Sequence, residues 1–169
     1  MVYYDVYESP MGPLLLESDG VFLTGLFLNR KLPETAAAAE ALPVFGQAKA
    51  WLDSYFRGER KAVDVPLKTG GTAFQQAVWE LLTQIPWGET ATYGAIAAAL
   101  AKSMGKERMS ARAVGQAVGK NPVCILIPCH RCVGAGGKLT GYAGGLDKKI
   151  WLLRHEGWPG DSSRTAERG

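Results

Sequence analysis

The residues best suited to chemistry in this sequence are a cysteine and a histidine at adjacent positions, Cys129 and His130. They follow residues 125–127, Ile-Leu-Ile, whose apolar and β-branched composition favours a buried strand. Pro128 ends that strand, because proline has no amide hydrogen to donate to a neighbouring strand. We therefore expect Cys129 to leave the end of a strand at a fixed angle, with an imidazole directly beside it.

This pairing is suited to nucleophilic chemistry at sulfur. A free cysteine is mostly protonated near neutral pH, so the nucleophile needs a neighbouring group that takes or stabilises its proton. Two other interpretations fit the same residues. Cys129 could be a small buried apolar residue, or zinc could be held by the cluster Cys124, Cys129, His130 and Cys132. Zinc is disfavoured because ligands at two adjacent positions are awkward on a strand.

A wider set of motifs surrounds the cysteine in a fixed order. They are Asn121-Pro122, Pro128-Cys129-His130-Arg131, Gly141-Tyr142-Ala143-Gly144-Gly145 and His155-Glu156-Gly157. The set closely resembles the active-site region of the alkylguanine-DNA alkyltransferases, also called methylated-DNA:protein-cysteine methyltransferases. The resemblance covers about residues 70–158. The four residues around Cys129 alone would be a weak match, whereas the ordered set is specific.

The resemblance implies a DNA-repair reaction. A methyl or other alkyl group would pass from the O6 atom of guanine, and from O4 of thymine, in double-stranded DNA to Cys129. The product is a thioether without a leaving group, so each molecule would act once. Neither a metal nor an organic cofactor is implied.

The same resemblance implies roles for residues around the cysteine. His130 would be the base, Glu156 would orient the imidazole, and Asn121 would hold the active-site turn. Tyr93 or Lys149 would donate to the departing guanine. The pocket around the extruded base would be lined by Tyr142, Ala143 and Gly144.

Two short predicted helices joined by a turn, one after Thr92 and one over residues 110–118, are typical of a helix-turn-helix. On the second helix, Ala111, Gly115 and Gly119 fall four residues apart, so one face is nearly bare backbone. Such a face can pack against another helix or approach the minor groove of DNA, which is about 6 Å wide. The resemblance favours the minor groove.

Arg112 and Tyr93 also have DNA-directed roles by resemblance. Arg112 would enter the base stack and fill the space left by the flipped nucleotide, a task suited to a planar guanidinium. On residue type alone, Arg112 would be a solvated charge or a phosphate contact. Tyr93 would act on the phosphate beside the target base. Extrusion is needed because O6 of guanine lies inside the duplex.

Composition and charge are compatible with these roles. The chain has 169 residues, enough for one large or two small domains with a proper core. A net charge of +3 and a pI of about 8.8 permit a nucleic-acid partner without demanding one. Three cysteines without a pairing pattern, no membrane-length apolar run and no signal sequence predict a reducing, cytoplasmic location. We expect a monomer.

The remaining patterns predict an α/β fold in two parts. Strands are expected over residues 2–8, 14–18 and 21–28, with a two-residue hairpin turn at Asp19-Gly20. Helices are expected over residues 45–56, 72–85 and 146–156, and a hairpin turn over 134–137. The predicted domains are a small ribonuclease-H-like sheet domain over 1–68, a mostly helical domain with a winged helix-turn-helix over 69–158, and a disordered tail over 159–169.

Some alternatives stay open. A protein of the same fold could sense alkylated bases without repairing them, although Cys129 argues against this. A Cys/His/Glu hydrolase would need an oxyanion hole, which the sequence does not show. Cys132 stands where the family usually has valine, and strand alternation predicts that it faces away from Cys129. Residues 101–109 form a long polar connection that is either a solvated loop or a source of phosphate contacts.

Overall fold

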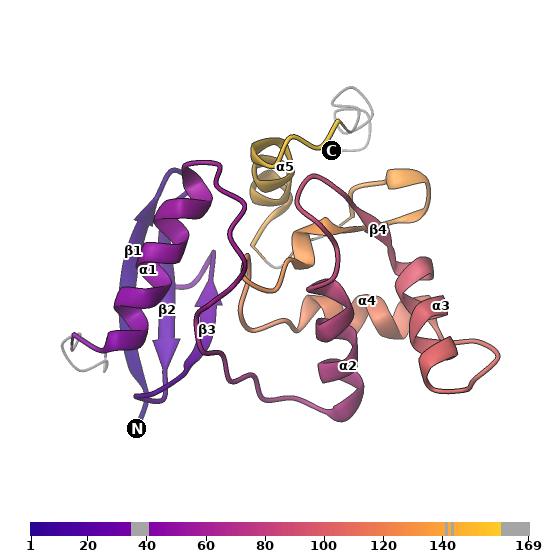
Figure 1. Cartoon of the computed structure of the whole chain (residues 1–169), viewed down its shortest axis with the longest axis horizontal. Helices are drawn as coiled ribbons and strands as arrows, with labels where there is room; N and C mark the ends of the chain where they lie inside the picture. Colours follow the sequence, from indigo (N-terminus) through magenta and orange to yellow (C-terminus); the bar gives the residue numbers. More distant parts are fainter. Residues whose placement is uncertain (35–40, 141, 143, 160–169) are drawn as a thin grey trace. The chain divides into compact units, whose positions relative to one another are not determined.

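The computed structural model describes residues 1–34, 41–140, 142 and 144–159. It divides into two compact units, which are described separately (Figure 1). The first unit contains Met1–Gly70 and Pro122–Cys124, and the second contains Gly71–Asn121 and the described residues from Ile125 onward. The expectations for residues 35–40, for Gly141 and Ala143, and for the tail over 160–169 lie outside the described residues.

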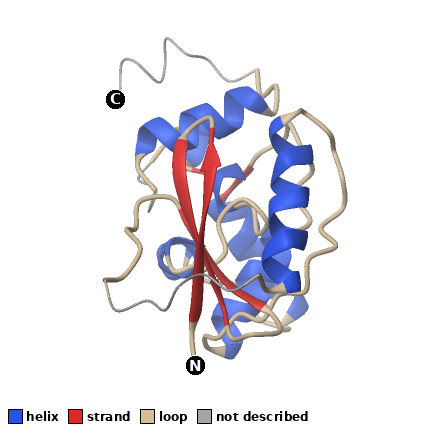
Figure 2. Cartoon of the chain, turned by 90° about the vertical axis from the view of Figure 1, so that its left-hand side faces the viewer, coloured by secondary structure: helices blue, strands red, loops and turns tan. Residues whose placement is uncertain are grey.

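The first unit is a three-stranded antiparallel sheet with one helix packed against it. Its elements are β1 (Tyr3–Ser9), β2 (Gly12–Ser18), β3 (Leu23–Phe27) and α1 (Pro43–Phe56), and the strand order is β1-β2-β3 (Figure 2). Two contacts fix α1 beside β1. The hydroxyl of Tyr7 donates to Asp53 at 2.6 Å, and Lys49 pairs with Asp5 at 2.7 Å. The three predicted strands and the predicted helix are confirmed, with small changes at their ends.

The turn between β2 and β3 differs from the expectation of a two-residue hairpin. Ser18 pairs with Leu23, so four residues, 19–22, form the loop. The carboxylate of Asp19 accepts hydrogen bonds from the backbone amides of Val21 and Phe22 at 2.9 and 2.8 Å. Aspartate competes in this way for the amides that a tight turn would leave unpaired, and it thereby stabilises the longer loop.

The second unit is mostly helical. Its elements are α2 (Ala73–Leu82), β4 (Ala91–Thr92), α3 (Tyr93–Ser103), α4 (Ala111–Gly119), the short 3-10 turns η1 (Cys129–Arg131) and η2 (Ala135–Gly137), β5 (Cys132–Val133) and α5 (Leu146–His155). Strands β4 and β5 pair in parallel. The mixed α/β class, with a small sheet first and a helical part after it, is confirmed.

Three helices of this unit begin at residues that cap them. The hydroxyls of Thr72, Thr92 and Ser110 accept hydrogen bonds from the backbone amides three residues ahead. Each side chain satisfies an amide that the first helical turn leaves without a partner. At Thr72 the capping is reciprocal, because the Gln75 side chain accepts from the Thr72 amide at 2.9 Å. Local sequence therefore fixes where α2, α3 and α4 start.

The strand expected over residues 125–127 does not form. Ile125 has a φ of 73°, in the left-handed region, and residues 125–126 form a turn. All three residues are nevertheless buried. The apolar run therefore identified burial correctly but not strand pairing, since burial alone does not require a neighbouring strand. The hairpin expected over 134–137 is also wrong, because these residues include η2 and no strand follows over 138–140.

Replacing Thr72 by alanine tests the cap of α2. Thr72→Ala should lower the free energy of unfolding by about 1 kcal/mol, because the amide of Gln75 loses its acceptor. Urea denaturation followed by tryptophan fluorescence measures the change. Thr83→Ala, at the exposed other end of the helix, is the control and should cost less than about 0.5 kcal/mol. Equal losses for the two variants would contradict the capping role.

Candidate active site

Cys129 lies at the start of the 3-10 turn η1 rather than at a strand end. Its amide donates to the carbonyl of Ile127 at 2.8 Å, and the amide of Cys132 donates to the carbonyl of Cys129. Only 4% of Cys129 is exposed. The sulfur is therefore held by a tight backbone turn within an apolar interior, with a small opening to its surroundings.

Asn121 holds this turn from the side. Its Nδ2 atom donates to the carbonyl of Ile127 at 2.8 Å, the same oxygen that accepts from the amide of Cys129. Asn121 itself is buried, with 7% exposed. Two donors on one carbonyl fix the backbone just before the cysteine, as the role expected for Asn121 requires.

His130 and Glu156 form a buried pair. The Nε2 atom of His130 lies 2.7 Å from a carboxylate oxygen of Glu156, and neither side chain is exposed. Because a carboxylate accepts, Nε2 carries the hydrogen and Nδ1 is the acceptor nitrogen of the ring. Nδ1 is buried and has no hydrogen-bond partner among the described residues. Burial lowers the pKa of His130 by more than Glu156 raises it, so the imidazole is neutral.

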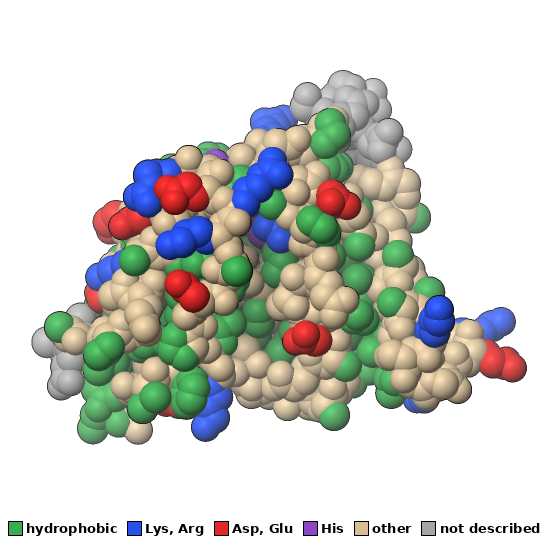
Figure 3. Space-filling model, in the orientation of Figure 1, with side chains coloured by type: hydrophobic (Ala, Val, Ile, Leu, Met, Phe, Trp, Pro, Cys, Tyr) green, Lys and Arg blue, Asp and Glu red, His purple; other side chains and the backbone are tan. Residues whose placement is uncertain are grey.

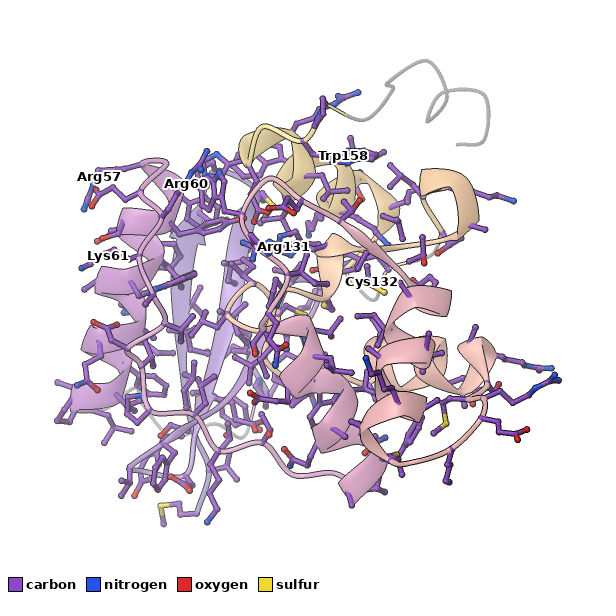
Figure 4. All side chains as sticks on the ribbon, turned by 45° about the vertical axis from the view of Figure 1, so that its right-hand side comes forward. Arg57, Arg60, Lys61, Arg131, Cys132 and Trp158 are labelled. Atoms are coloured by element: carbon purple, nitrogen blue, oxygen red, sulfur yellow. The ribbon has the colours of Figure 1, made fainter. Side chains whose placement is uncertain are left out.

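Arg131 completes the environment of Glu156. Its guanidinium donates to both carboxylate oxygens, at 2.7 and 3.0 Å, and to the carbonyl of Ile85 at 2.7 Å (Figure 4). Burial alone would raise the pKa of Glu156, but hydrogen bonds from His130 and Arg131, together with the charge of Arg131, outweigh it and hold that pKa well below its usual range. Since His130 is neutral, Arg131 supplies the positive charge. Sequence reasoning assigned Arg131 no role, although it belongs to the motif around Cys129.

Lys149 and Tyr142 meet Cys129 from the other side. The Tyr142 hydroxyl is 3.8 Å from the sulfur of Cys129, and the Nζ atom of Lys149 is 5.9 Å from the centre of the Tyr142 ring. Lys149 is almost fully buried and donates to the carbonyl of Cys132 at 2.7 Å. Burial lowers the pKa of Lys149. Tyr142 therefore lies at the sulfur, and Lys149 lies beside Tyr142 and the Cys132 carbonyl.

Tyr93 begins α3 and lies against α4. Its hydroxyl is 3.2 Å from the hydroxyl of Thr140, and burial raises its pKa. Gly115 of α4 lies beside the Tyr93 ring. A Cβ atom added to Gly115 would be 3.7 Å from the ring, which is an ordinary van der Waals distance. Ala111 and Arg112 are exposed at the first turn of α4. Gly144 is buried beside the start of α5, while Ala143 lies outside the described residues.

The expectation that Cys132 faces away from Cys129 depended on an extended chain, and that premise is wrong, because residues 129–131 form a 3-10 turn. Cys132 is fully buried, and burial raises its pKa to about 12. Cys124 is also buried, in the segment that bridges to β3. Burial therefore disfavours ionisation of the Cys132 thiol.

Two further findings concern the part of the chain that the structure describes. Within it, no three His, Cys, Asp or Glu side chains lie together as a metal site. No helix in it is long and apolar enough to cross a membrane.

Comparison with known proteins matches both units. Residues 2–69 match the ribonuclease-like domain of 6-O-methylguanine DNA methyltransferase, and residues 73–158 match its DNA binding domain. The methylated-DNA–protein-cysteine methyltransferase of Methanosarcina acetivorans is 46% identical over 159 residues, covering 92% of this chain and 99% of the relative. That of Haemophilus influenzae is 42% identical over 163 residues, covering 94% and 88%.

A solved structure is similar over nearly the whole chain. The crystal structure of Mycobacterium tuberculosis OGT in complex with DNA has a TM-score of 0.77 and 43% sequence identity to this protein. The match covers 96% of this chain and 94% of that one.

The buried pair should make stability depend on pH in a defined direction. His130 is neutral in the folded protein and is protonated more easily in the unfolded chain. Stability therefore falls as the pH drops below 6.5, the ordinary pKa of histidine. Glu156 has a depressed pKa, so its contribution is fully present above 4.5 and is lost as the pH falls below that value.

Glu156→Gln should therefore lower the free energy of unfolding at neutral pH by about 3 kcal/mol, because it leaves the Arg131 guanidinium without its anion. The gap to the parent protein should narrow below pH 4.5. Urea denaturation between pH 8 and 3 measures both effects. Glu89→Gln, at an exposed position, is the control and should change neither. A gap independent of pH would show that the charge of Glu156 is not what matters.

Proposed function

The chain belongs to the 6-O-methylguanine DNA methyltransferase family, and we propose that it repairs DNA by transferring an alkyl group from a damaged base to its own Cys129. The substrates are O6-alkylguanine and, by the same chemistry, O4-alkylthymine in double-stranded DNA. One observation carries the assignment to Cys129: this residue directly precedes a histidine that pairs with a buried carboxylate, and its sulfur contacts the Tyr142 hydroxyl.

Activation of the sulfur starts from the acceptor nitrogen of His130. The thiol proton of Cys129 passes through a bridging water to Nδ1, the ring nitrogen that has no hydrogen-bond partner among the described residues. Glu156 accepts the Nε2 hydrogen and stabilises the imidazolium that forms. Arg131 keeps Glu156 ionised although it is buried. The Cys129 thiolate therefore forms when His130 accepts the thiol proton.

Transfer is a displacement at the alkyl carbon. The thiolate forms a bond to that carbon, the bond from carbon to O6 breaks, and the electron pair stays with the guanine, which then takes up a proton. Lys149 is the better donor of the two candidates, because burial lowers its pKa while burial raises that of Tyr93. Tyr142 and Gly144 line the pocket for the extruded base. The thioether product has no leaving group, so each molecule reacts once.

DNA binding falls to α3 and α4, which we propose form the helix-turn-helix. The small residues Ala111 and Gly115 let α4 approach the minor groove, Arg112 enters the base stack, and Tyr93 acts on the phosphate beside the target base. On the face in Figure 3, Lys and Arg side chains occur with Asp and Glu among them. Because the net charge is only +3, binding is modest and dependent on salt, and the small residues of α4 make it nearly independent of sequence.

The division of labour follows the two predicted domains. Residues 69–158 bind DNA and accept the alkyl group, while residues 1–68 support them. We propose that the protein acts as a monomer. We place it in the cytoplasm, where a reducing environment keeps the acceptor thiol available.

The central test is to map the modified residue. An oligonucleotide duplex containing O6-methylguanine is mixed with an excess of protein, and the protein is digested and analysed by mass spectrometry. One methyl group per molecule should be found on Cys129, and Cys129→Ser should accept none while still binding DNA.

Cys124→Ala and Cys132→Val are the matched controls and should each accept one methyl. A methyl on either of those residues, or several turnovers per molecule, would contradict the mechanism. Binding to methylated DNA without any transfer would support the alternative of a sensor that does not repair.

A second prediction concerns Arg112. Arg112→Ala should slow repair of duplex DNA at least ten-fold, because the flipped nucleotide then leaves an unfilled gap in the base stack. A ten-fold change corresponds to about 1.4 kcal/mol of activation free energy. Transfer from free benzylguanine should change little, since a free base needs no extrusion. Single-turnover rates on both substrates measure the effect. Arg60→Ala, in the first unit (Figure 4), is the control; equal slowing on both substrates would refute the role of Arg112.

A further inference from the structure

Cys129 and Cys132 have the spacing and backbone of a pair that can be linked. They form a Cys-x-x-Cys sequence, a spacing used by thiols that exchange between reduced and disulfide forms. The amide of Cys132 donates to the carbonyl of Cys129 and closes a turn from i to i+3. Such turns bring the two Cα atoms within about 7 Å, near the range of about 4.4–6.8 Å found in disulfides.

The two residues also share one environment. Cys132 directly follows η1, and Lys149 donates to its carbonyl at 2.7 Å. Both residues are buried, with 4% of Cys129 and 0% of Cys132 exposed, so solvent does not separate them. Cys132 is labelled in Figure 4, directly after Arg131.

We propose that Cys129 and Cys132 form a reversible disulfide when the protein meets a peroxide, and that this protects the alkyl acceptor from irreversible oxidation while switching it off. The loss of activity, but not the disulfide itself, rests on the function proposed above. Cys129 is the residue that reacts first, because a site that admits an alkylated base to this sulfur also admits a peroxide.

The reaction balances in two steps. The thiolate of Cys129 attacks a peroxide oxygen, the O–O bond breaks, and sulfenic acid and water form after protonation. The sulfur of Cys132 then attacks the sulfur of that sulfenic acid, the S–O bond breaks, and a second water leaves. In total the two thiols lose two hydrogen atoms and one peroxide is consumed. A dithiol reductant reverses the change.

Burial keeps Cys132 from competing in the normal reaction. Its thiol is held protonated, so it is a poor nucleophile towards an alkylated base. Attack on the sulfenic acid is different, because the partner sulfur is fixed three residues away and the encounter needs no diffusion. Lys149, whose buried amine donates to the carbonyl of Cys132, is placed to take the proton of that thiol when its amine is neutral.

The test uses the full chain, reduced and then treated with hydrogen peroxide. Remaining thiols are blocked, and the protein is digested with trypsin. Cleavage after Lys120, Arg131 and Lys138 separates the two cysteines, so the disulfide should hold peptides 121–131 and 132–138 together until reductant is added. Cys124→Ala, which removes the other thiol of the first peptide, should give the same linked pair.

Activity provides an independent readout. After peroxide, the parent protein should lose methyl acceptance and regain nearly all of it with dithiothreitol. Cys132→Val should lose acceptance without regaining it, as Cys129 proceeds to sulfinic acid. A second variant, Cys132→Ser, should behave in the same way if loss of sulfur rather than of packing is responsible.

Peptide mapping of the parent protein decides the question without any variant. Sulfinic acid on Cys129 without the linked peptides would overturn the proposal, as would full recovery of Cys132→Val. If the linked pair forms but the reduced protein accepts no methyl, the disulfide stands and the proposed function fails.

Discussion

The candidate site depends on one buried carboxylate, that of Glu156. Glu156 has no exposed side-chain surface, so an ionised form there is costly unless it is fully paired. Two hydrogen bonds from Arg131 and one from His130 occupy its oxygens. Arg131 also donates through Nη1 to the carbonyl of Ile85. The ion pair therefore orients the imidazole and also ties η1 and α5 to the end of α2.

The arrangement also explains why neighbouring residues in the motif have such different roles. The tight turn at η1 sends consecutive side chains in different directions, so Cys129 faces Tyr142 while His130 faces Glu156. A flat strand would have alternated them between two faces. Asn121 stabilises the start of the turn through the carbonyl of Ile127. Cys129 and His130 are thus adjacent in sequence yet belong to different hydrogen-bond groups.

Much of this could be predicted from the sequence, for physical reasons that are local. Thr72, Thr92 and Ser110 mark helix starts because capping depends on residues three positions apart. Alternating and helical apolar patterns gave the sheet and α1. The strand over residues 125–127 was wrong because an apolar run reports burial, and Ile125 meets that demand in a turn with a left-handed φ. The contacts of Arg131 join partners 25 and 46 residues away, which no local pattern encodes.

The short parallel pairing of β4 with β5 has a consequence for how this chain can vary. Ala91 pairs with Cys132 and Thr92 with Val133, so backbone hydrogen bonds set the position of Tyr93, the next residue, relative to Cys129. Replacing a side chain leaves these backbone hydrogen bonds in place, whereas inserting one residue between Thr92 and Tyr93 would move Tyr93 relative to Cys129. Residues 104–109, which join α3 to the capping residue Ser110, lie outside this pairing, so a change in their length leaves it in place. The protein thus separates a segment where evolution can add or delete residues from one where only substitution is tolerated.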